Sequence, residues 1–463
     1  MTVPRTWFAA LVIGAVFLGI YADGLGHGFV KDDFRWIAAA DVSSPRDLQR
    51  IFTTNVGFYR PLVTLSFAVD RGIWHLDPRG YAVTNLMLLA ADAVLLFALA
   101  RRLSLSPAVA LFAVTVWLFN FHGINMALLW ISGRTALLLC LFSLGAALAW
   151  TERRRAIAAL LTLAAMLCKE EALLLPALLV LIDVYSPDIG VQAPPLKPAI
   201  RRAWPLWATA AIYLLVRAHS GAFGPFDAPP YYQLTAHPRI VTKNATEYLD
   251  RGATWAAVSA LLMFLVAPRG LSLNDDERRV VRFGVLWFGC MFAITVFVPT
   301  RSSLYAVAPS MGSALAAASF ASRAERANRN RFTLVSAALI AVIALLIPVY
   351  RLRNRGLVEP GDLSAQAMSE VQRAARADPQ LREMVFVDVA GAPVTLEDAF
   401  GGLIPEAIHL FVSPDVRVDV RDVADRLDDG PNRLVFELRR GRLIQARTRT
   451  KGSPADTSPS HSG

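Results

Sequence analysis

The sequence has few charged residues for its length. Only 18% of its 463 residues are charged and 55% are hydrophobic, whereas about 25% of the residues in an ordinary soluble domain are charged. The apolar residues come in blocks that approach the ~20 residues needed to cross about 30 Å of hydrocarbon. This composition argues against a soluble enzyme and predicts a polytopic membrane protein.

The sequence also has few cysteines. Cys140, Cys168 and Cys290 all lie inside apolar blocks, where a cysteine behaves as a small buried hydrophobic residue. Their spacing fits neither a disulfide framework nor a zinc site. We therefore predict no metal site formed by these residues.

The first apolar segment has no cleavage motif of the A-x-A type after it. Arg5 precedes it, as in a signal peptide, but Tyr21-Ala22-Asp23-Gly24 follows. We interpret this segment as a first transmembrane helix. The apolar blocks together predict about eleven spans, at residues 6–23, 80–100, 107–122, 127–150, 154–170, 172–186, 204–219, 252–268, 282–299, 304–321 and 332–350.

The net charge of +10 comes mostly from arginine and lysine in short loops between these blocks. Such loops stay in the cytoplasm, so the charge indicates membrane topology and not nucleic-acid binding. With a cytoplasmic N-terminus, five basic loops fall on the cytoplasmic side. We predict a multi-pass protein of a bacterial inner (plasma) membrane, in contact with membrane lipids. The loop cations are Arg101, Arg102, Arg153, Arg154, Arg155, Lys197, Arg201, Arg202, Arg269, Arg278, Arg279, Arg282, Arg323, Arg326, Arg329 and Arg331.

Three parts follow from this pattern. Residues 1–350 form the transmembrane domain, which contains a large first outer loop at 24–79. An odd number of spans places residues 351–450, a small α+β domain, outside the cytoplasm. Residues 451–463 are rich in Ser, Pro and Gly and are predicted to be disordered. The elements predicted in the α+β domain are helices at 362–377 and 397–411, strands at 384–389 and 416–420, and a hairpin of 433–438 with 442–447.

Two adjacent carboxylates, Asp32 and Asp33, follow the first span. At a membrane surface, the low local dielectric and the neighbouring charge raise the pKa of one of them, which suits a general base. The alternative is that the pair caps the helix that follows.

Three cations are candidate ligands of a phosphate group. Arg60, Lys169 and Arg301 come from three different loops, and guanidinium and ammonium groups bind phosphate through charge-assisted hydrogen bonds. The alternatives are that Arg60 reaches lipid headgroups, and that Lys169 and Glu170 compensate each other at a hairpin tip.

The other site candidates are His122, Arg134, Glu170 and Tyr305. Arg134 lies inside an apolar block, where an ionisable group is costly and is by default a functional candidate. The predicted topology places the acidic pair, the three cations, His122 and Glu170 on one side of the membrane. That combination suits the transfer of a group from an anionic lipid phosphate.

The order of these motifs resembles the GT-C superfamily of polyprenyl-phosphate-sugar-dependent glycosyltransferases. The resemblance is strongest to the protein O-mannosyltransferase branch, glycosyltransferase family 39. The residues of the motifs are particularly similar to those of transmembrane O-mannosyltransferases with tetratricopeptide repeats. The residues that carry it are Asp32-Asp33, Tyr59-Arg60-Pro61-Leu62, Gly80-Tyr81, Asn85, His122, Trp130, Gly133-Arg134, Cys168-Lys169-Glu170-Glu171 and Leu175-Pro176, with Arg301 to Tyr305 as a later part.

The resemblance implies a GT-C-like helical fold and a catalytic role for Asp32 or Asp33. It implies a polyprenyl-phosphate-linked sugar as donor and a protein, lipid or glycan as acceptor. Two features depart from the family. Leu86-Met87-Leu88-Leu89 stands where the family usually has a histidine, and the chain after Tyr350 shows no tetratricopeptide periodicity.

Two other classes of protein compete with a glycosyltransferase. A flippase for a lipid-linked glycan would share the basic outer surface, but polar residues are few in the spans and no inverted repeat is seen. A non-catalytic scaffold gives no reason for Asp32, Asp33 and Arg134. No cofactor is predicted, although the acidic pair could hold a divalent cation.

Overall fold

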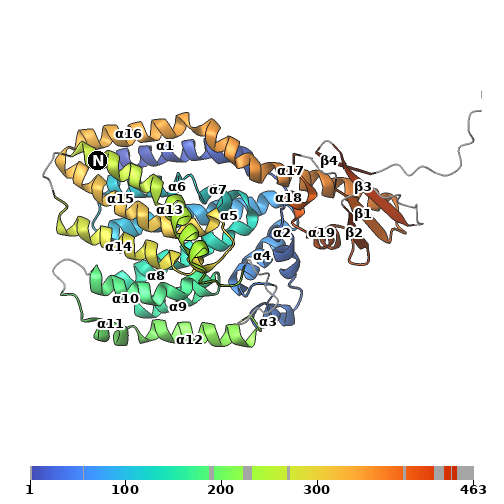
Figure 1. Ribbon diagram of the computed structural model, residues 1–463, viewed down its shortest axis with the longest axis horizontal. Helices are drawn as coiled ribbons and strands as arrows, with labels where there is room; N and C mark the ends of the chain where they lie inside the picture. Colours follow the sequence, from blue (N-terminus) through green and yellow to red (C-terminus); the bar gives the residue numbers. More distant parts are fainter. Residues whose placement is uncertain are drawn as a thin grey trace, which may run out of the picture. The chain divides into compact units, whose positions relative to one another are not determined.

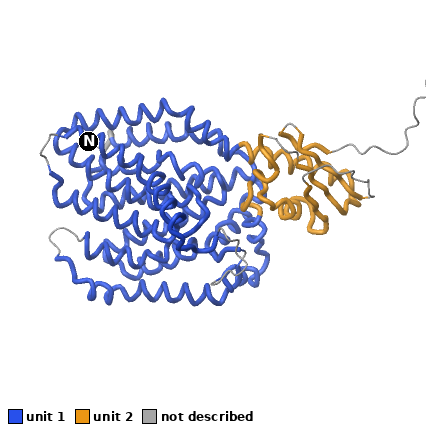
Figure 2. Tube along the Cα trace, viewed as in Figure 1, with its two compact units in different colours: residues 1–29, 35–358 blue, residues 30–34, 359–463 orange. Residues whose placement is uncertain are grey.

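The computed structural model describes residues 3–55, 57–186, 192–222, 232–267, 272–388, 393–421, 432–439 and 441–445. The chain divides into two compact units (Figure 2). The helical unit contains residues 1–29 and 35–358, and the sheet unit contains residues 30–34 and 359–463. The predicted disordered tail, 451–463, lies outside the described residues.

Long apolar helices form the helical unit (Figure 1). In hydrocarbon, a helix satisfies the backbone hydrogen bonds of a segment internally. Pro78 is the first residue of α5, a position that proline fits. The long helices of this unit are α1 (Val3–Tyr21), α5 (Pro78–Arg102), α8 (Arg134–Thr151), α13 (Pro238–Val266), α14 (Asp275–Phe292), α15 (Val307–Ala327) and α16 (Arg329–Leu345). Helix α17 (Ile347–Ala377) belongs to the helical unit up to Val358 and to the sheet unit from Glu359 onward.

Shorter helices fill the spaces beside them. Proline again begins several of these helices, as Pro61 begins α4. The shorter helices are α2 (Asp32–Ala39), α3 (Pro45–Thr53), α4 (Pro61–Trp74), α6 (Pro107–Leu118), α7 (Ile124–Leu129), α9 (Arg155–Met166), α10 (Leu175–Tyr185), α11 (Leu196–Arg202) and α12 (Trp204–His219). Short 3₁₀ turns lie at Ala22–Gly24, Ile131–Gly133, Glu170–Leu174, Thr295–Phe297 and Ser303–Ala306.

The prediction of eleven spans is wrong. Among the described residues, six helical segments are long and apolar enough to cross a membrane, or seven when α16 and α17 count as one span bent by 50°. The bend lies next to Pro348, because a proline ring removes a hydrogen-bond donor and clashes with the preceding turn. The six segments are Thr6–Gly24, Pro78–Arg102, Ile131–Thr151, Pro238–Val266, Asp275–Phe297 and Ser303–Ala327.

Length explains the difference from the sequence prediction. Helices α6 and α9 have 12 residues each and α10 has 11. At about 1.5 Å per residue, 12 residues extend for only about 18 Å, which is less than the ~30 Å of hydrocarbon. Counting apolar blocks therefore does not fix the side of the membrane on which the chain ends.

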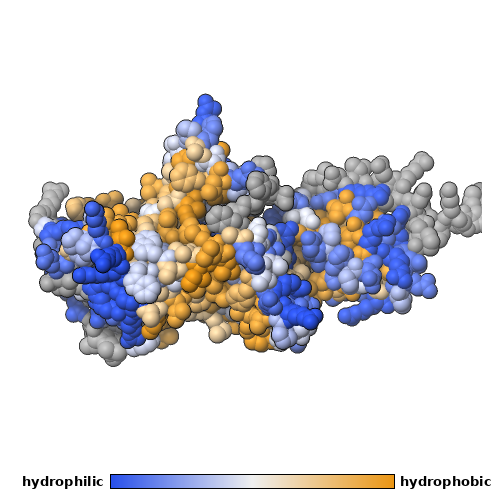
Figure 3. Space-filling view, turned by 90° about the horizontal axis from the view of Figure 1, so that it is seen from below, coloured by the Kyte–Doolittle hydropathy of each residue, from blue (hydrophilic) through white to orange (hydrophobic). Residues whose placement is uncertain are grey.

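The surface of the helical unit is apolar where its helices face outward. Trp7, Leu11, Met87, Leu265 and Leu345 are each more than half exposed. Figure 3 shows hydrophobic residues across the middle of one face of this unit, with hydrophilic residues toward both of its ends. A large exposed apolar surface needs a partner, and the long apolar helices identify that partner as membrane hydrocarbon.

The arginine-rich loops gather at one end of the helical unit. Arg102 donates to the Thr151 carbonyl oxygen at 2.6 Å, which joins the ends of α5 and α8. Ser106 donates to Glu325 at 2.6 Å, which joins the start of α6 to the end of α15. Other contacts at this arginine-rich end are Arg153 and Arg155 with Asp183, Arg279 with Ser186, and Arg326 with Glu277.

The sheet unit contains a four-stranded sheet in the order β2-β1-β3-β4. Strand β1 pairs in parallel with β2 and β3, and β4 pairs antiparallel with β3. Phe386 and Phe436 lie opposite each other on β1 and β3, and their rings stack at 5.4 Å. The strands are β1 (Glu383–Val387), β2 (Arg417–Arg421), β3 (Arg433–Arg439) and β4 (Arg442–Gln445).

The helix predicted at 397–411 is two helices in the structure, α18 (Leu396–Phe400) and α19 (Ile404–Phe411). The chain turns between them at Gly401, whose φ of +56° lies in the left-handed region that glycine adopts at low cost. Pro405 therefore stands in the first turn of α19, where proline is tolerated.

Candidate functional site

One carboxylate at the end of the helical unit opposite the arginine-rich end is held by two arginines. Arg60, the residue before α4, donates to Glu170 Oε2 from Nε at 3.1 Å and from Nη2 at 2.8 Å. Arg217, near the end of α12, donates to the other oxygen at 3.2 Å and to the Tyr213 hydroxyl at 2.9 Å. Three segments that are far apart in sequence therefore meet at Glu170.

The two guanidinium groups keep Glu170 ionised. Burial acts to raise the pKa of Glu170, but the charges of Arg60 and Arg217 outweigh it and lower that pKa to about 2. Burial acts to lower the pKa of Arg60, the charge of Glu170 acts to raise it, and the net effect is a raised pKa. Both partners are therefore charged at every physiological pH.

A second ion pair lies beside the first. Lys169 Nζ is 2.7 Å from Glu171 Oε1, and only 2% of the lysine side chain and 7% of the glutamate side chain are exposed. The Lys169 ammonium also lies 4.6 Å from the centre of the Tyr305 ring, a cation–π contact. Breaking a pair as buried as this one would leave an uncompensated charge.

Tyr305 connects these pairs to Arg301. Its ring packs edge-on against Tyr248, with centroids 6.1 Å apart. The neighbouring residue on α13, Glu247, pairs with Arg301 at 3.4 Å and with Arg251 at 3.0 Å. Arg301 remains 33% exposed, so its guanidinium is accessible to a ligand.

Positive charge exceeds negative charge in this group. We define the cation cluster as the carboxylates Glu170, Glu171 and Glu247 together with the cations that pair with them. Three carboxylates stand against six cations, so the formal excess is three positive charges. The cations are Arg60, Arg217, Lys169, Lys243, Arg251 and Arg301.

His122 belongs to a network next to this cluster. Arg353 donates to His122 Nδ1 at 2.8 Å, and the His122 amide donates to Asn120 at 3.1 Å. Asn120 in turn donates to the Arg251 carbonyl oxygen at 3.1 Å. Burial and the Arg353 charge lower the pKa of His122 from 6.5 to about 4. The imidazole is therefore neutral at neutral pH.

Acid should destabilise the protein through His122. Between about pH 6.5 and pH 4 the unfolded histidine binds a proton that the folded one does not bind, so the free energy of unfolding falls as the pH falls. Protonation would also place a donor against Arg353, which can only donate. As the pH is lowered through this range in detergent, the thermal midpoint of unfolding should decrease for the parent protein and decrease less for His122→Asn. His219, which is exposed, provides the control, and an equal change in His219→Asn would contradict this assignment.

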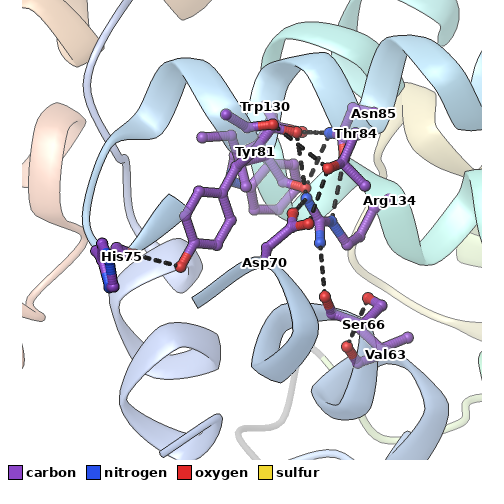
Figure 4. A network of polar contacts seen from close by, with 11 residues as sticks. Val63, Ser66, Asp70, His75, Tyr81, Thr84, Asn85, Trp130 and Arg134 are labelled. Atoms are coloured by element: carbon purple, nitrogen blue, oxygen red, sulfur yellow. Dashed lines mark hydrogen bonds and ion pairs between the residues drawn. The ribbon is translucent and has the colours of Figure 1, made fainter. Parts of the chain in front are cut away.

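Arg134 lies apart from the cation cluster, in a buried polar network (Figure 4). Its Nη2 donates to Asp70 at 2.6 Å and its Nε donates to Asn85 at 3.0 Å. Thr84 donates to the other oxygen of Asp70 at 2.8 Å, and the guanidinium lies 4.3 Å from the centre of the Phe67 ring. Arg134 is fully buried, and each of its partners is buried or half-buried.

This network fixes the position of α4. Asp70 lies on α4, Asn85 on α5 and Arg134 at the start of α8. Gly133 allows the turn before α8 to pack closely, because a Cβ there would lie 2.4 Å from the Met126 carbonyl oxygen. Since Arg60 directly precedes α4, a fixed α4 also fixes the position of Arg60.

The acidic pair belongs to the sheet unit, together with Val30, Lys31 and Phe34. Asp33 is fully buried, and its Oδ2 accepts the Val30 amide at 2.8 Å. Asp33 is the second residue of α2, so this bond joins the first turn of the helix to the backbone that precedes it. Asp32 is half-buried. Asp33 therefore makes a structural contact at the start of α2, and a catalytic role for the acidic pair stays a prediction.

Four of the residues that the sequence singled out belong to the cation cluster: Arg60, Lys169, Glu170 and Arg301. Tyr305 lies against Lys169, and His122 lies in the adjacent network. Sequence reasoning missed Arg217, Tyr213, Tyr248, Glu247 and Arg353 as site residues. The arginines at helix ends carry the same signal as topogenic cations, so spacing alone does not distinguish them.

Within the described residues, no group of three or more His, Cys, Asp or Glu side chains could hold a metal ion.

Comparison with known proteins gives partial support to the predicted family. No family model matches the chain. The chain is similar to protein O-mannosyl-transferase Tmtc1 of Drosophila melanogaster, with 33% identity over 196 residues. The match covers 36% of this chain and 22% of that protein, so the chain spans about a fifth of the length of this curated relative. At the level of the family, the similarity supports a protein O-mannosyltransferase-like glycosyltransferase, as the motifs predict.

Proposed function

We propose that this protein is a membrane glycosyltransferase that takes a sugar from a polyprenyl-phosphate carrier. The observation that carries the donor assignment is the cation cluster, in which three carboxylates are paired with six cations. A surplus of fixed positive charge stabilises the phosphate that leaves when the sugar is transferred. The similarity to Tmtc1 supports the transfer of a sugar.

The chemistry needs one base and several cations. A carboxylate of the acidic pair takes the proton of an acceptor hydroxyl or amine. The acceptor atom then bonds to the anomeric carbon as the bond between that carbon and the phosphate oxygen breaks. The electron pair leaves with the polyprenyl phosphate, whose charge Arg60, Lys169 and Arg301 stabilise. The acceptor is a protein, a lipid or a glycan.

A direct assay tests this function. Purified protein in lipid vesicles is supplied with polyprenyl-phosphate-linked hexoses and a mixture of acceptor proteins, lipids and glycans. Release of polyprenyl phosphate is measured together with the appearance of sugar on an acceptor. Movement of the lipid-linked sugar between leaflets without any transfer would indicate a flippase instead.

We place the arginine-rich end in the cytoplasm and the cation cluster on the outer side, the periplasmic side of a bacterial inner membrane. The gathering of five basic loops at one end supports this orientation, because such loops are retained in the cytoplasm. The sheet unit is proposed to lie outside the cytoplasm.

Labelling from outside intact cells should reach one exposed side chain and miss another. Arg373→Cys lies in the sheet unit and Arg154→Cys at the arginine-rich end, and the parent side chains are 72% and 64% exposed. An impermeant maleimide should label the first and should label the second only after the cells are lysed. The reverse pattern would invert the proposed orientation.

Replacing Arg301 by Ala should weaken use of the donor without unfolding the protein. Arg251 and Lys243 still pair with Glu247 in this variant, so no buried carboxylate loses all its partners. A hydrogen bond to a charged group contributes about 1.5–3 kcal/mol, so the KM for the donor should rise roughly 10-fold to 100-fold. Steady-state kinetics at a saturating acceptor concentration measure the KM for the donor.

Arg278→Ala is the matched control for this measurement. Arg278 also pairs with a carboxylate, Asp275, but at the arginine-rich end. Its loss should leave the KM for the donor unchanged. If both variants change that KM equally, or neither does, Arg301 does not bind the donor.

A further inference from the structure

The short segment that carries the acidic pair packs on residues more than 360 positions later in the chain. Phe34 is fully buried. Its ring stacks on Phe400 with centroids 5.4 Å apart and meets Phe411 edge-on at 6.4 Å. Aromatic pairs of this kind add directional attraction to the burial of apolar area. Phe34 therefore attaches its segment to Phe400 and Phe411 through specific ring contacts.

The backbone beside the acidic pair is held as well. The Lys31 amide donates to the Ala399 carbonyl oxygen at 2.9 Å. The Lys31 side chain covers Gly401, where an added Cβ would lie 3.1 Å from Lys31 Cγ and 3.4 Å from Lys31 Cβ. Asp32 and Asp33 thus lie between two attachment points, Lys31 and Phe34, which both contact the α18 region.

The attachment has a consequence for catalysis that rests on the proposed function. The carboxylates of Asp32 and Asp33 take their position from α18 and α19 in addition to the helix that they begin. Displacing a reacting group by about 1 Å can lower a rate by about 100-fold. We propose that Phe34 and Phe400 are positioning residues that, within the sheet unit, hold the catalytic carboxylate.

A disulfide tests the contact without any assay of activity. In the full-length double variant Lys31→Cys/Gly401→Cys, the two Cβ atoms lie close to the roughly 3.5–4.5 Å found in disulfides. Oxidation should link the peptides that contain positions 31 and 401, as detected by mass spectrometry, and neither single variant should form this link. A cysteine at position 401 would have to adopt the positive φ of Gly401, which strains the backbone. Hydrogen exchange on the protein without these cysteines therefore provides a second measurement. The Lys31 amide should exchange slowly, and faster in Phe400→Ala.

The effect on catalysis needs a control that weakens the same unit elsewhere. Phe436 stacks on Phe386 at the same centroid distance as Phe34 on Phe400, 5.4 Å. Phe400→Ala should lower kcat about 10-fold to 100-fold with little change in the KM for the donor. Phe436→Ala should lower kcat less. Adding the Lys31→Cys/Gly401→Cys disulfide to Phe400→Ala should restore kcat, and reduction should remove the gain.

The outcomes separate this inference from the proposed function. Without the disulfide and without slow exchange at Lys31, the sheet unit does not hold the segment and the inference fails. Equal losses in Phe400→Ala and Phe436→Ala, with no rescue by the disulfide, would also overturn it. A parent protein that transfers no sugar from any polyprenyl-phosphate hexose removes the proposed function, and the disulfide then still decides whether the segment is held.

Discussion

Replacing Asp32 by Asn should reduce sugar transfer by about 10²–10⁴-fold, the usual contribution of a positioned base. Asparagine keeps the size of the side chain but cannot accept the proton. Asp32 is half-buried, whereas Asp33 is fully buried and accepts the Val30 amide at the start of α2. We therefore expect Asp32 to be the carboxylate that takes the proton of the acceptor. Initial rates at saturating donor and acceptor concentrations measure the loss.

Asp33→Asn should affect stability more than chemistry. The amide oxygen of asparagine can still accept the Val30 hydrogen bond, although without the charge that favours a helix N-terminus. We expect transfer to fall less than in Asp32→Asn and the thermal midpoint to fall more. A double variant that still transfers sugar near the parent rate would show that the base lies elsewhere in the protein.

Removing the Arg134 guanidinium should be the most destabilising change in the helical unit. Arg134→Met leaves the Asp70 carboxylate buried without its cation, and breaking a buried pair in this way costs about 3–5 kcal/mol. Both side chains are almost wholly buried, at 0% and 3% exposure. Equilibrium unfolding in detergent measures the loss, and Arg134→Met should also lower the yield of folded protein.

Two comparisons decide whether the pair itself is responsible. The double variant Asp70→Leu/Arg134→Met removes both charges and should lose less stability than the two single variants added together. Arg155→Met is a matched control, because Arg155 also lies over an aromatic ring, that of Trp150, but is 30% exposed and pairs with Asp183 at only 3.4 Å. A loss in Arg155→Met as large as in Arg134→Met would contradict this account.

The Arg134 network also changes the interpretation of the motifs. Tyr81, Asn85, Trp130 and Arg134 were grouped by resemblance to a glycosyltransferase family. In the structure they belong to one network (Figure 4), in which Arg134 donates to Asp70, Asn85 and the Tyr81 carbonyl oxygen. Asn85 in turn donates to the Trp130 carbonyl oxygen. Their contribution to a site is to hold α4, and through it Arg60, which faces Glu170. Whether Arg134 also contacts a substrate stays a prediction.

Local sequence determined the features that depend on local physics. Apolar blocks identify a membrane protein because burying apolar area in hydrocarbon depends on composition alone. Pro61 and Pro78 mark the starts of α4 and α5 because proline fits the first helical turn. The structure gathers at one end of the helical unit the basic loops that the sequence had grouped together, and the side of the membrane on which this end lies stays a prediction. Lys169 and Glu170 stood out because they interrupt a long apolar run, and Arg60 stood out as a possible phosphate ligand in the large first loop.

Tertiary structure decided the features that depend on partners far away in the chain. Nothing near Glu170 in sequence indicates that Arg217 pairs with it, and nothing near Arg134 indicates that it pairs with Asp70. The number of spans depends on where each helix ends, which short turns decide and hydropathy does not. The acidic pair was assigned to a loop of the transmembrane domain, yet Phe34 packs on Phe400. Such contacts form only when the chain is folded, because side-chain packing selects partners by shape and not by separation in sequence.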